Sequence, residues 1–367
     1  MKTLLYILAL SSILFANQAD TASCNKCHPT ITQEFQSSMH KKSSIYEDKV
    51  HAAVWDKHPE KAKGNYNCAE CHTPNVTSEE AAHEGITCIS CHTIKSVTKH
   101  AARNKNVYAK DKHTLYSAEA SRETEIVKYK TTTTWWGNKT TTGSAYHDID
   151  YTNKDYYTGE MCMGCHSHKQ NTHQFDVCRT EDAGAKNVKK NCITCHMPKI
   201  PGTATTVRLS DTHAYHGFAG ARVEPRMLAK HVGLSLENKD TNFNIILDNQ
   251  APHDLMSHPL RVVQLRATLV RANTHIALKT HSFVKTIGHQ GKPTMPWLAT
   301  EVVKNSMIKA DEKRSVAFER ELQSGDRVEV VLGFYVVNPK VLKKLNLDGD
   351  KELSKFTVLK SQNFTIE

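Results

Sequence analysis

The chain has 367 residues and contains 48 Lys or Arg against 38 Asp or Glu, which gives a formal charge of +10 at pH 7. This length predicts two or three domains. The basic residues are spread along the whole chain and form no basic block, so nucleic acid is not expected as a partner. Only 39% of the residues are hydrophobic, which indicates that aliphatic side chains do not fill the whole interior.

The first residues have the features of an export signal. Lys2 supplies one positive charge, and a mostly apolar run follows from Leu4 to Ala16. The run is shorter than the roughly twenty residues that a membrane-spanning helix needs. We therefore expect residues 1–16 to be a cleaved signal peptide, with a boundary as late as residue 22, and the mature chain to be periplasmic and not membrane-spanning. The alternative is that this segment remains as a membrane anchor.

One short pattern, Cys-x-x-Cys-His, occurs five times. Its two thiols can each add to a vinyl group of one haem, and the histidine then binds the iron from the proximal side. The pattern predicts five covalently attached c-type haems and uses ten of the eleven cysteines, leaving Cys178. The predicted attachment residues are Cys24, Cys27, Cys68, Cys71, Cys88, Cys91, Cys162, Cys165, Cys192 and Cys195, and the predicted proximal ligands are His28, His72, His92, His166 and His196.

Three other roles for paired cysteines fit the sequence less well. A structural zinc site closes with two Cys pairs, so five pairs leave one pair over, and zinc does not require a histidine after every second cysteine. A thioredoxin-like redox motif normally occurs once. Disulfide scaffolds are usually much smaller domains.

A haem iron has a sixth position, and the histidines outside the motifs are candidates for it. The chain has 22 histidines, of which five belong to the motifs and 17 do not. A second histidine gives a low-spin iron that is suited to electron transfer. His58 shares one helical face with His51, and His83 lies one turn before the third motif. Methionine is the alternative ligand, at Met39, Met161, Met163 or Met197.

The spacing of the motifs predicts which haems are neighbours. Short intervals separate the second motif from the third and the fourth from the fifth, so we expect each of these pairs to lie close together. The longest interval, between Cys88 and Cys162, contains Thr131–Thr134 and Trp135-Trp136. We expect this segment to cross the surface and return with a ligand. Packing of the two tryptophans against a haem face is the alternative.

After residue 201 the pattern changes. No cysteine follows, and hydrophobic residues alternate with polar ones at 232–236, 263–269, 328–337 and 356–366, which indicates half-buried strands. A short run from Pro339 to Leu345 indicates a helix. We therefore predict a mainly α-helical or irregular pentahaem cytochrome domain over 23–201 and an all-β, sandwich-like domain over 202–367, α+β overall.

Four stretches share patterns with one group of known proteins. They are Phe35-Gln-Ser-Ser-Met-His40, Glu84-Gly-Ile-Thr-Cys-Ile-Ser-Cys-His-Thr-Ile94, Ala145-Tyr-His147 ahead of Tyr157-Thr-Gly-Glu-Met-Cys162, and Cys195-His-Met-Pro198 followed by Thr212-His213. They resemble motifs of the multihaem cytochromes related to hydroxylamine oxidoreductase, nitrite reductase and their small quinol-oxidising partners. The resemblance implies that His40, His147 and His213 are distal ligands.

Two further stretches resemble degraded forms of the elements that open a trailing β-domain in many such cytochromes. They are His213-Ala-Tyr-His-Gly-Phe-Ala-Gly220 and Asp248-Asn-Gln-Ala-Pro-His253. In those relatives the second histidine can reach back to a haem, but the glycine that precedes it is missing here. The distal ligands that we predict are therefore His40, His58, His83, His147 and His213.

The sequence favours an electron carrier of anaerobic respiration over an enzyme. A carrier would pass electrons between a quinol-oxidising membrane donor and a terminal reductase or another cytochrome. The alternative is a reductase of a small nitrogen or sulfur oxyanion with one haem iron left open, because the resemblance includes such enzymes. Against it, the Cys-x-x-Cys-Lys attachment site of the nitrite reductases is absent. Cys178 stays unassigned, since a lone cysteine is most often simply buried.

Overall fold

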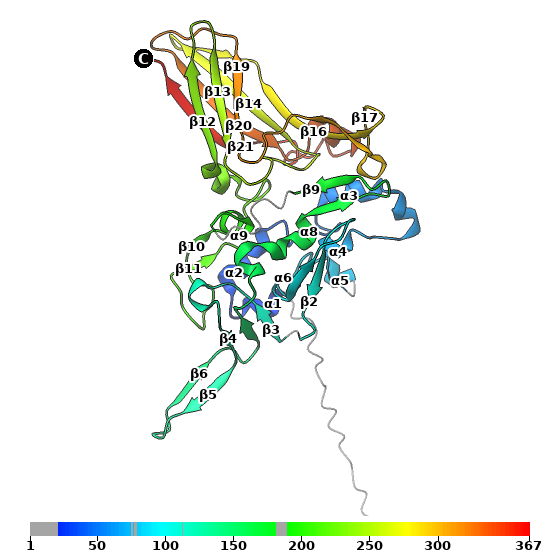
Figure 1. Ribbon diagram of the computed structural model, residues 1–367, viewed down its shortest axis with the longest axis vertical. Coiled ribbons are helices and arrows are strands. Elements are labelled where there is room, and N and C mark those ends of the chain that lie inside the picture. Colours follow the sequence, from blue (N-terminus) through cyan, green and yellow to red (C-terminus); the bar gives the residue numbers. More distant parts are fainter. Residues whose placement is uncertain (1–20, 75, 77–78, 112, 181–188) are drawn as a thin grey trace, which may run out of the picture.

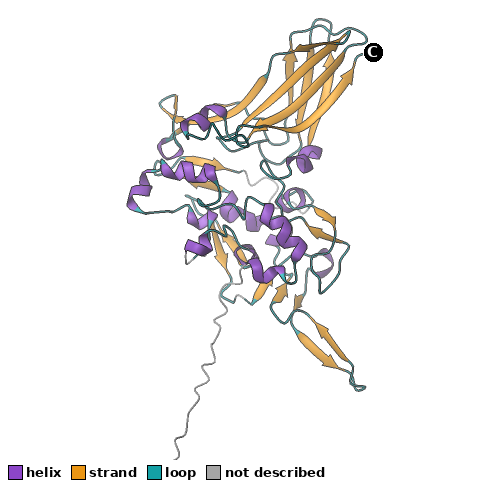
Figure 2. Cartoon of the chain, turned by 180° about the vertical axis from the view of Figure 1, so that it is seen from behind, coloured by secondary structure: helices purple, strands orange, loops and turns teal. Residues whose placement is uncertain are grey.

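The computed structural model describes residues 21–74, 76, 79–111, 113–180 and 189–367 (Figure 1). The predicted signal peptide over residues 1–16 lies outside this part of the chain. The described chain is mixed α/β: short helices and small sheets form the middle of the molecule, and long strands form one end (Figure 2). Within these ranges, no helix has the length and apolar character that crossing a bilayer requires.

Short helices carry the Cys-x-x-Cys-His motifs. Four of them end at a motif histidine: α4 (Ala69–His72), α6 (Cys88–His92), α8 (Met163–His166) and α9 (Cys192–His196). A helix places the first, fourth and fifth residues of the motif on one face, so both thiols and the imidazole point the same way. The other helices of this part are α1 (Thr21–Asn25), α2 (Pro29–Ser37), α3 (Lys49–Asp56), α5 (Glu79–Ala82) and α7 (Asp155–Thr158), with 3-10 helices η1 (Pro59–Lys63), η2 (Ala120–Arg122) and η3 (Glu160–Cys162).

Five sheets of two or three strands connect these helices in the described residues. The strands are β1 (Ile94–Thr98) with β2 (Lys105–Tyr108); β3 (Thr114–Tyr116) and β4 (Ile126–Val127) on either side of β7 (Asp148–Asp150); β5 (Lys130–Thr133) with β6 (Lys139–Thr142); β8 (His168–Gln170) with β9 (Asp176–Arg179); and β10 (Lys199–Pro201) with β11 (Thr212–Ala214). The prediction of a mainly helical or irregular part omitted these sheets, because such short strands show no clear period-two pattern.

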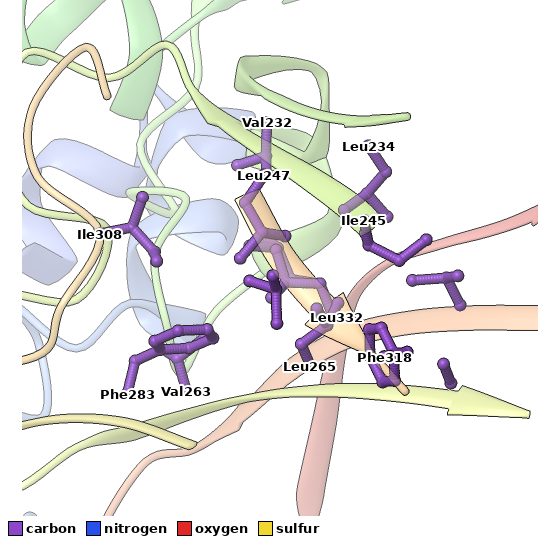
Figure 3. Close-up of a cluster of buried hydrophobic side chains, with 14 of the residues drawn as sticks. Val232, Leu234, Ile245, Leu247, Val263, Leu265, Phe283, Ile308, Phe318 and Leu332 are labelled. Atoms are coloured by element: carbon purple, nitrogen blue, oxygen red, sulfur yellow. The ribbon is translucent and has the colours of Figure 1, made fainter. Parts of the chain in front are cut away.

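Two larger sheets pack face to face in the C-terminal part. One contains β12 (Val232–Asn238), β13 (Phe243–Asn249) and β19 (Lys313–Phe318). The other contains β14 (Val262–Arg271), β15 (Thr274–Ala277), β16 (His281–His289), β17 (Lys292–Pro293), β18 (Glu301–Asn305), β20 (Arg327–Tyr335) and β21 (Phe356–Thr365). Side chains of both sheets, including Ile245, Leu265, Phe318 and Leu332, form one buried cluster between them (Figure 3).

The period-two pattern located the long strands. Burial along β14 alternates from Val263 to Leu269, so one face lies in the core and the other does not. The four predicted strand runs coincide with β12, β14, β20 and β21, and the predicted helix is α10 (Pro339–Lys344). The remaining 3-10 helices are η4 (Pro225–His231) and η5 (Pro296–Leu298). The domain division at residue 201 stays a prediction, and β10 pairs with β11 across it.

A second buried cluster joins the N-terminal helices to the strands. Val50 of α3 packs with Val337 and with Leu342 of α10. Beside it, Lys49 forms an ion pair with Asp350 at 2.8 Å. Helix α3 is therefore fixed against the C-terminal part.

Arg271 and Asp326 form a bidentate ion pair within the C-terminal part. Nε and Nη2 of Arg271 donate to the Asp326 carboxylate at 2.9 and 2.6 Å, and Asp326 is only 2% exposed. The hydrogen bonds from Arg271 lower the pKa of Asp326. Ionised Asp326 therefore contributes stability at neutral pH that is lost as the pH falls through its folded-state pKa.

We expect Asp326→Asn to lower the free energy of unfolding by about 1–3 kcal/mol, because it weakens hydrogen bonds to a buried charge. Urea unfolding of the haem-loaded protein at pH 7 measures the loss. Lys313→Ala is the matched control: Lys313 lies 4.0 Å from Asp248 and its side chain is 73% exposed, so its loss should stay below about 1 kcal/mol. Equal losses in the two variants would contradict this account of the pair.

Candidate functional site

One connected cavity lies among the motif helices. Its volume is about 3710 Å³, against roughly 300–1,000 Å³ for a pocket that holds one small molecule. All ten motif cysteines and all five motif histidines line it. Five motifs that are spread from residue 24 to residue 196 therefore surround one shared space.

Four of the five motif histidines direct one ring nitrogen to a backbone carbonyl and keep the other free. Nδ1 lies 2.6 to 3.0 Å from a backbone carbonyl oxygen in His28, His72, His92 and His196. A carbonyl only accepts, so Nδ1 carries the proton and Nε2 keeps its lone pair. Metal-binding histidines are commonly held in this way.

Four motif histidines each face a second histidine across the cavity. The ring centroids are 6.3 Å apart for His28 and His147, 6.3 Å for His92 and His216, 5.9 Å for His166 and His40, and 6.1 Å for His196 and His253. Two imidazoles that bind one metal from opposite sides, at about 2.0–2.1 Å each, hold their ring centres roughly 6 Å apart. Each pair therefore leaves the room that an iron with two axial histidines needs.

Two of the four partner histidines have hydrogen bonds that match those of the motif histidines. Nδ1 of His216 donates to Ala214 and Nδ1 of His253 donates to Asp254, both at 2.7 Å, so their Nε2 lone pairs are free. Nδ1 of His40 is buried without a hydrogen-bond partner. The ten thiols, the free lone pairs and the cavity together fit covalently bound haem.

The second motif differs from the other four. The rings of His72 and His51 have centroids only 4.1 Å apart. Both Nδ1 atoms approach the same carbonyl oxygen of Ser43, at 3.0 and 2.9 Å, and Nε2 of His51 contacts the Tyr66 hydroxyl at 3.2 Å. The two rings therefore lie side by side, too close for an iron between them. No other histidine ring pairs with His72 among the residues that the structure describes.

Of the five predicted distal ligands, His40 and His147 face motif histidines, whereas two others lie away from them. His83 has a half-exposed side chain and stacks on Tyr46 at 4.2 Å. His58 lies against Trp297, and its Nδ1 accepts a hydrogen bond from the backbone N–H of Glu60. That bond places the proton on Nε2, which then has no lone pair for a metal. His58 and His83 are replaced in the ligand set proposed below.

His213 is buried, but it holds a neighbouring segment instead of facing a motif histidine. Its Nδ1 lies 2.9 Å from the Gly202 carbonyl oxygen, and its Nε2 lies 2.8 Å from one carboxylate oxygen of Glu34. Both ring nitrogens are therefore engaged in hydrogen bonds. The other oxygen of Glu34 accepts the backbone N–H of His216 at 2.8 Å. His213 and Glu34 therefore position the turn that carries His216 opposite His92.

Sequence reasoning passed over His216 and ranked His253 below the five selected residues. Both lie in stretches that the resemblance had singled out, so a signal was present. In the stretch 213–220 the prediction selected His213, whereas the ring that faces a motif histidine is that of His216, because spacing does not show which ring points where.

Burial keeps these imidazoles neutral. Desolvation lowers the pKa of His40 to about 3 and the pKa values of His72 and His216 to about 4. It also lowers the pKa values of His92 and His196. A neutral imidazole keeps the lone pair that a metal requires.

Contacts between thiols show which motifs adjoin. The close pairs are Cys24 with Cys88, Cys71 with Cys165, and Cys162 with Cys192. The first motif thus adjoins the third, the second adjoins the fourth, and the fourth adjoins the fifth. The short interval between the fourth and fifth motifs predicted their contact. The short interval between the second and third motifs predicted a contact as well, but the thiol close to the second motif belongs to the fourth motif.

Cys178 lies in β9 on the cavity wall, opposite Lys169 of β8 in the strand register. Desolvation raises the pKa of its thiol, so Cys178 is neutral. Cys71 and Arg261 are close enough to shift the pKa of this thiol electrostatically. Cys178 therefore belongs to the wall of the second motif's part of the cavity.

We expect Glu34→Ala to loosen the segment that carries His216. Removing charge-assisted hydrogen bonds worth about 1.5–3 kcal/mol should speed hydrogen exchange of the amides at 212–216 by about tenfold to a hundredfold. Exchange mass spectrometry of the haem-loaded protein measures this. Glu60→Ala is the control, since Glu60 bonds only to its own neighbourhood at Lys63 and Asn65. Unchanged exchange at 212–216 in Glu34→Ala would contradict the positioning role.

This chain is similar to a known protein family and to a solved structure. The sequence model of the family described as "Cytochrome c554 and c-prime" matches residues 23–93, which contain the first three motifs. No curated protein matches the chain. Among solved structures, the chain resembles a penta-heme cytochrome c552 from Thermochromatium tepidum, with a TM-score of 0.71 and 20% identity over 95% of this chain and 98% of that chain. The motifs, the cavity and these similarities support a multihaem c-type cytochrome.

Proposed function

We propose that this chain is a pentahaem c-type cytochrome that transfers electrons in the periplasm. Each motif would hold one haem by two thioether bonds, with the motif histidine as the proximal ligand. The support for five is that all ten motif cysteines line one cavity. The support for export is the apolar run that ends at Ala16.

The distal ligands follow from the facing rings. We assign His147 to the first motif, His216 to the third, His40 to the fourth and His253 to the fifth. The observation that carries the proposal is the repeated separation of 5.9 to 6.3 Å between ring centroids. In each of these four pairs the separation leaves room for one iron, whereas rings in direct contact, such as those of His51 and His72 at 4.1 Å, leave none.

Bound haem supplies an iron that accepts and releases one electron, and two axial histidines suit this because they bind both oxidation states. The chain supplies the rest. It holds the imidazoles neutral and oriented, and it brings the motifs into contact. Besides the three close thiol pairs, Cys91 of the third motif lies within electrostatic range of Cys162 of the fourth. All five sites are therefore connected, with the fourth motif adjoining the second, third and fifth and the first adjoining the third, as a carrier requires.

The partners that we propose are redox proteins: a quinol-oxidising membrane cytochrome as donor and a terminal reductase or another cytochrome as acceptor. The support for these partners is the resemblance of the motif stretches, and we propose a role in anaerobic respiration.

Electron paramagnetic resonance of the ferric, haem-loaded protein tests the ligand assignment. We expect His216→Ala to convert one low-spin centre to high-spin, because the third motif loses its facing imidazole. His83→Ala is the control, since His83 lies on the surface beside Tyr46, and its spectrum should equal that of the wild type. If His216→Ala also leaves the spectrum unchanged, the assignment of His216 is wrong.

One observation favours a second function at the second motif. His72 has His51 beside it rather than opposite it. Lys169, Arg261 and Lys285 line the same cavity, and Lys169 is close enough to lower the pKa of His72. The imidazoles of His51 and His258 lie in this part of the cavity as well, and a site with several cations suits a small anion as substrate. This is the arrangement that a reductase of a small nitrogen or sulfur oxyanion would need.

Spin counting distinguishes the two functions. One high-spin centre among five, with a spectrum that changes when nitrite is added, would support the reductase. If His72→Met alters only that centre, the centre belongs to the second motif. Five low-spin centres that respond neither to nitrite nor, when reduced, to carbon monoxide would leave the reductase without a site.

A further inference from the structure

A single hairpin projects from the body at the end opposite the long strands (Figure 1). Strands β5 and β6 pair in register from Lys130 opposite Thr142 to Thr133 opposite Lys139, and all eight of their residues are exposed. The turn is closed by hydrogen bonds from the Thr134 N–H to Asn138 and from the Gly137 N–H to Thr134. A two-stranded hairpin without a packed face is only marginally stable in water. A partner that binds this hairpin would stabilise it.

Two tryptophans form the tip of this hairpin. Trp135 is 83% exposed and Trp136 is 73% exposed, and their rings lie 3.6 Å apart. They therefore do not pack against a haem face, which was one of the two expectations for this segment. Exposed large aromatic side chains that touch mainly each other mark an interaction site.

The charge of the segment is uniform. Between residues 128 and 147 the basic residues are Lys128, Lys130 and Lys139, and no Asp or Glu occurs. The tryptophans thus lie at the end of a polar, threonine-rich arm that carries only positive charge. Indole rings concentrate at the boundary between lipid headgroups and acyl chains, and lysines near the surface are attracted to anionic headgroups.

We propose that the tip of the β5–β6 hairpin binds the surface of an anionic lipid bilayer. Four residues per strand at about 3.4 Å each give the arm enough reach to place both indoles at the headgroup level while the body stays in water. Lys139, which follows the turn at the tip, then lies nearest the negative surface, whereas Lys130 and Lys128 lie at the base of the arm. A protein partner would need to offer both an acidic surface and a pocket for indole rings. An anionic bilayer offers negative headgroups and an interface that accepts indole rings at every point of its surface.

Docking by this hairpin orients the molecule. Strand β6 leads directly to His147, which faces His28 of the first motif, and Tyr129 at the base of the arm lines the cavity. Under the proposed function, on which only this step rests, the first motif becomes the site nearest the membrane. An electron donor in the membrane would therefore reach the first motif before the others.

Flotation with lipid vesicles tests the proposal on the mature, haem-loaded protein. We expect binding to vesicles that contain phosphatidylglycerol, weak binding to vesicles of phosphatidylcholine alone, and loss of binding as salt is raised. Trp135→Ser/Trp136→Ser should bind the anionic vesicles about tenfold more weakly. Haem content and thermal stability should equal those of the wild type, because both residues are exposed at a turn.

The matched control is Val302→Ser/Lys304→Ala on β18, which also removes exposed apolar surface, removes one positive charge in addition, and lies in the larger sheet of the C-terminal part. It should bind like the wild type. Three results would overturn the proposal: no binding of the wild type to anionic vesicles, equal binding of the tryptophan variant and the control, or tryptophan-dependent capture of an acidic protein without vesicle binding. None of these readouts depends on electron transfer, so they are independent of the proposed function.

Discussion

The structure depends on filling one cavity of about 3710 Å³. A protein interior is close-packed, and a void of this size would forfeit the contacts of every side chain that lines it. The N-terminal part lacks the side chains to fill it. Among the described residues, seven buried hydrophobic residues precede residue 201 and 29 follow it. Ten thiols and a set of neutral imidazoles surround the space instead, so its contents must be large, apolar and bound through those groups.

The C-terminal part is built on a different principle but belongs to the same site. Its two sheets bury a conventional hydrophobic core, with Ile245 and Leu332 among its members, and it needs no cofactor to do so. The loop between β13 and β14 nevertheless brings His253 opposite His196 of the fifth motif. Helix α10 packs against α3 through the cluster of Val50 and Leu342. The strands therefore form one wall of the cavity rather than a separate appendage.

The sequence predicted the long strands well and indicated c-type haem, for physical reasons. The thioether motif is local, since its three reactive groups lie within five residues and one helical turn. Strands such as β14 were found because one face is buried and the other is not, which imposes a period of two. Strands as short as Ile126–Val127 bury no such face, and they went unseen.

The distal ligands were harder to predict because they are defined by folding rather than by local pattern. His213 and His216 are equally plausible from the sequence, and only the carboxylate of Glu34, 179 residues away from His213, shows that His213 is a support and His216 is free. Nδ1 of His58 accepts a hydrogen bond from the backbone N–H of Glu60, so its lone pair is already in use. The sequence did not show whether Trp135 and Trp136 pack against a haem face or lie on the surface. The exposed strands on either side of them show that they lie on the surface.

The central claim is that each motif binds a haem covalently and that these haems fill the shared cavity. The intact mass of the denatured mature protein, isolated from cells that attach c-type haem, tests it most directly. The account predicts the mass of the processed polypeptide plus five haems. A mass equal to the bare polypeptide, or one that corresponds to fewer than five haems in fully matured protein, would contradict it.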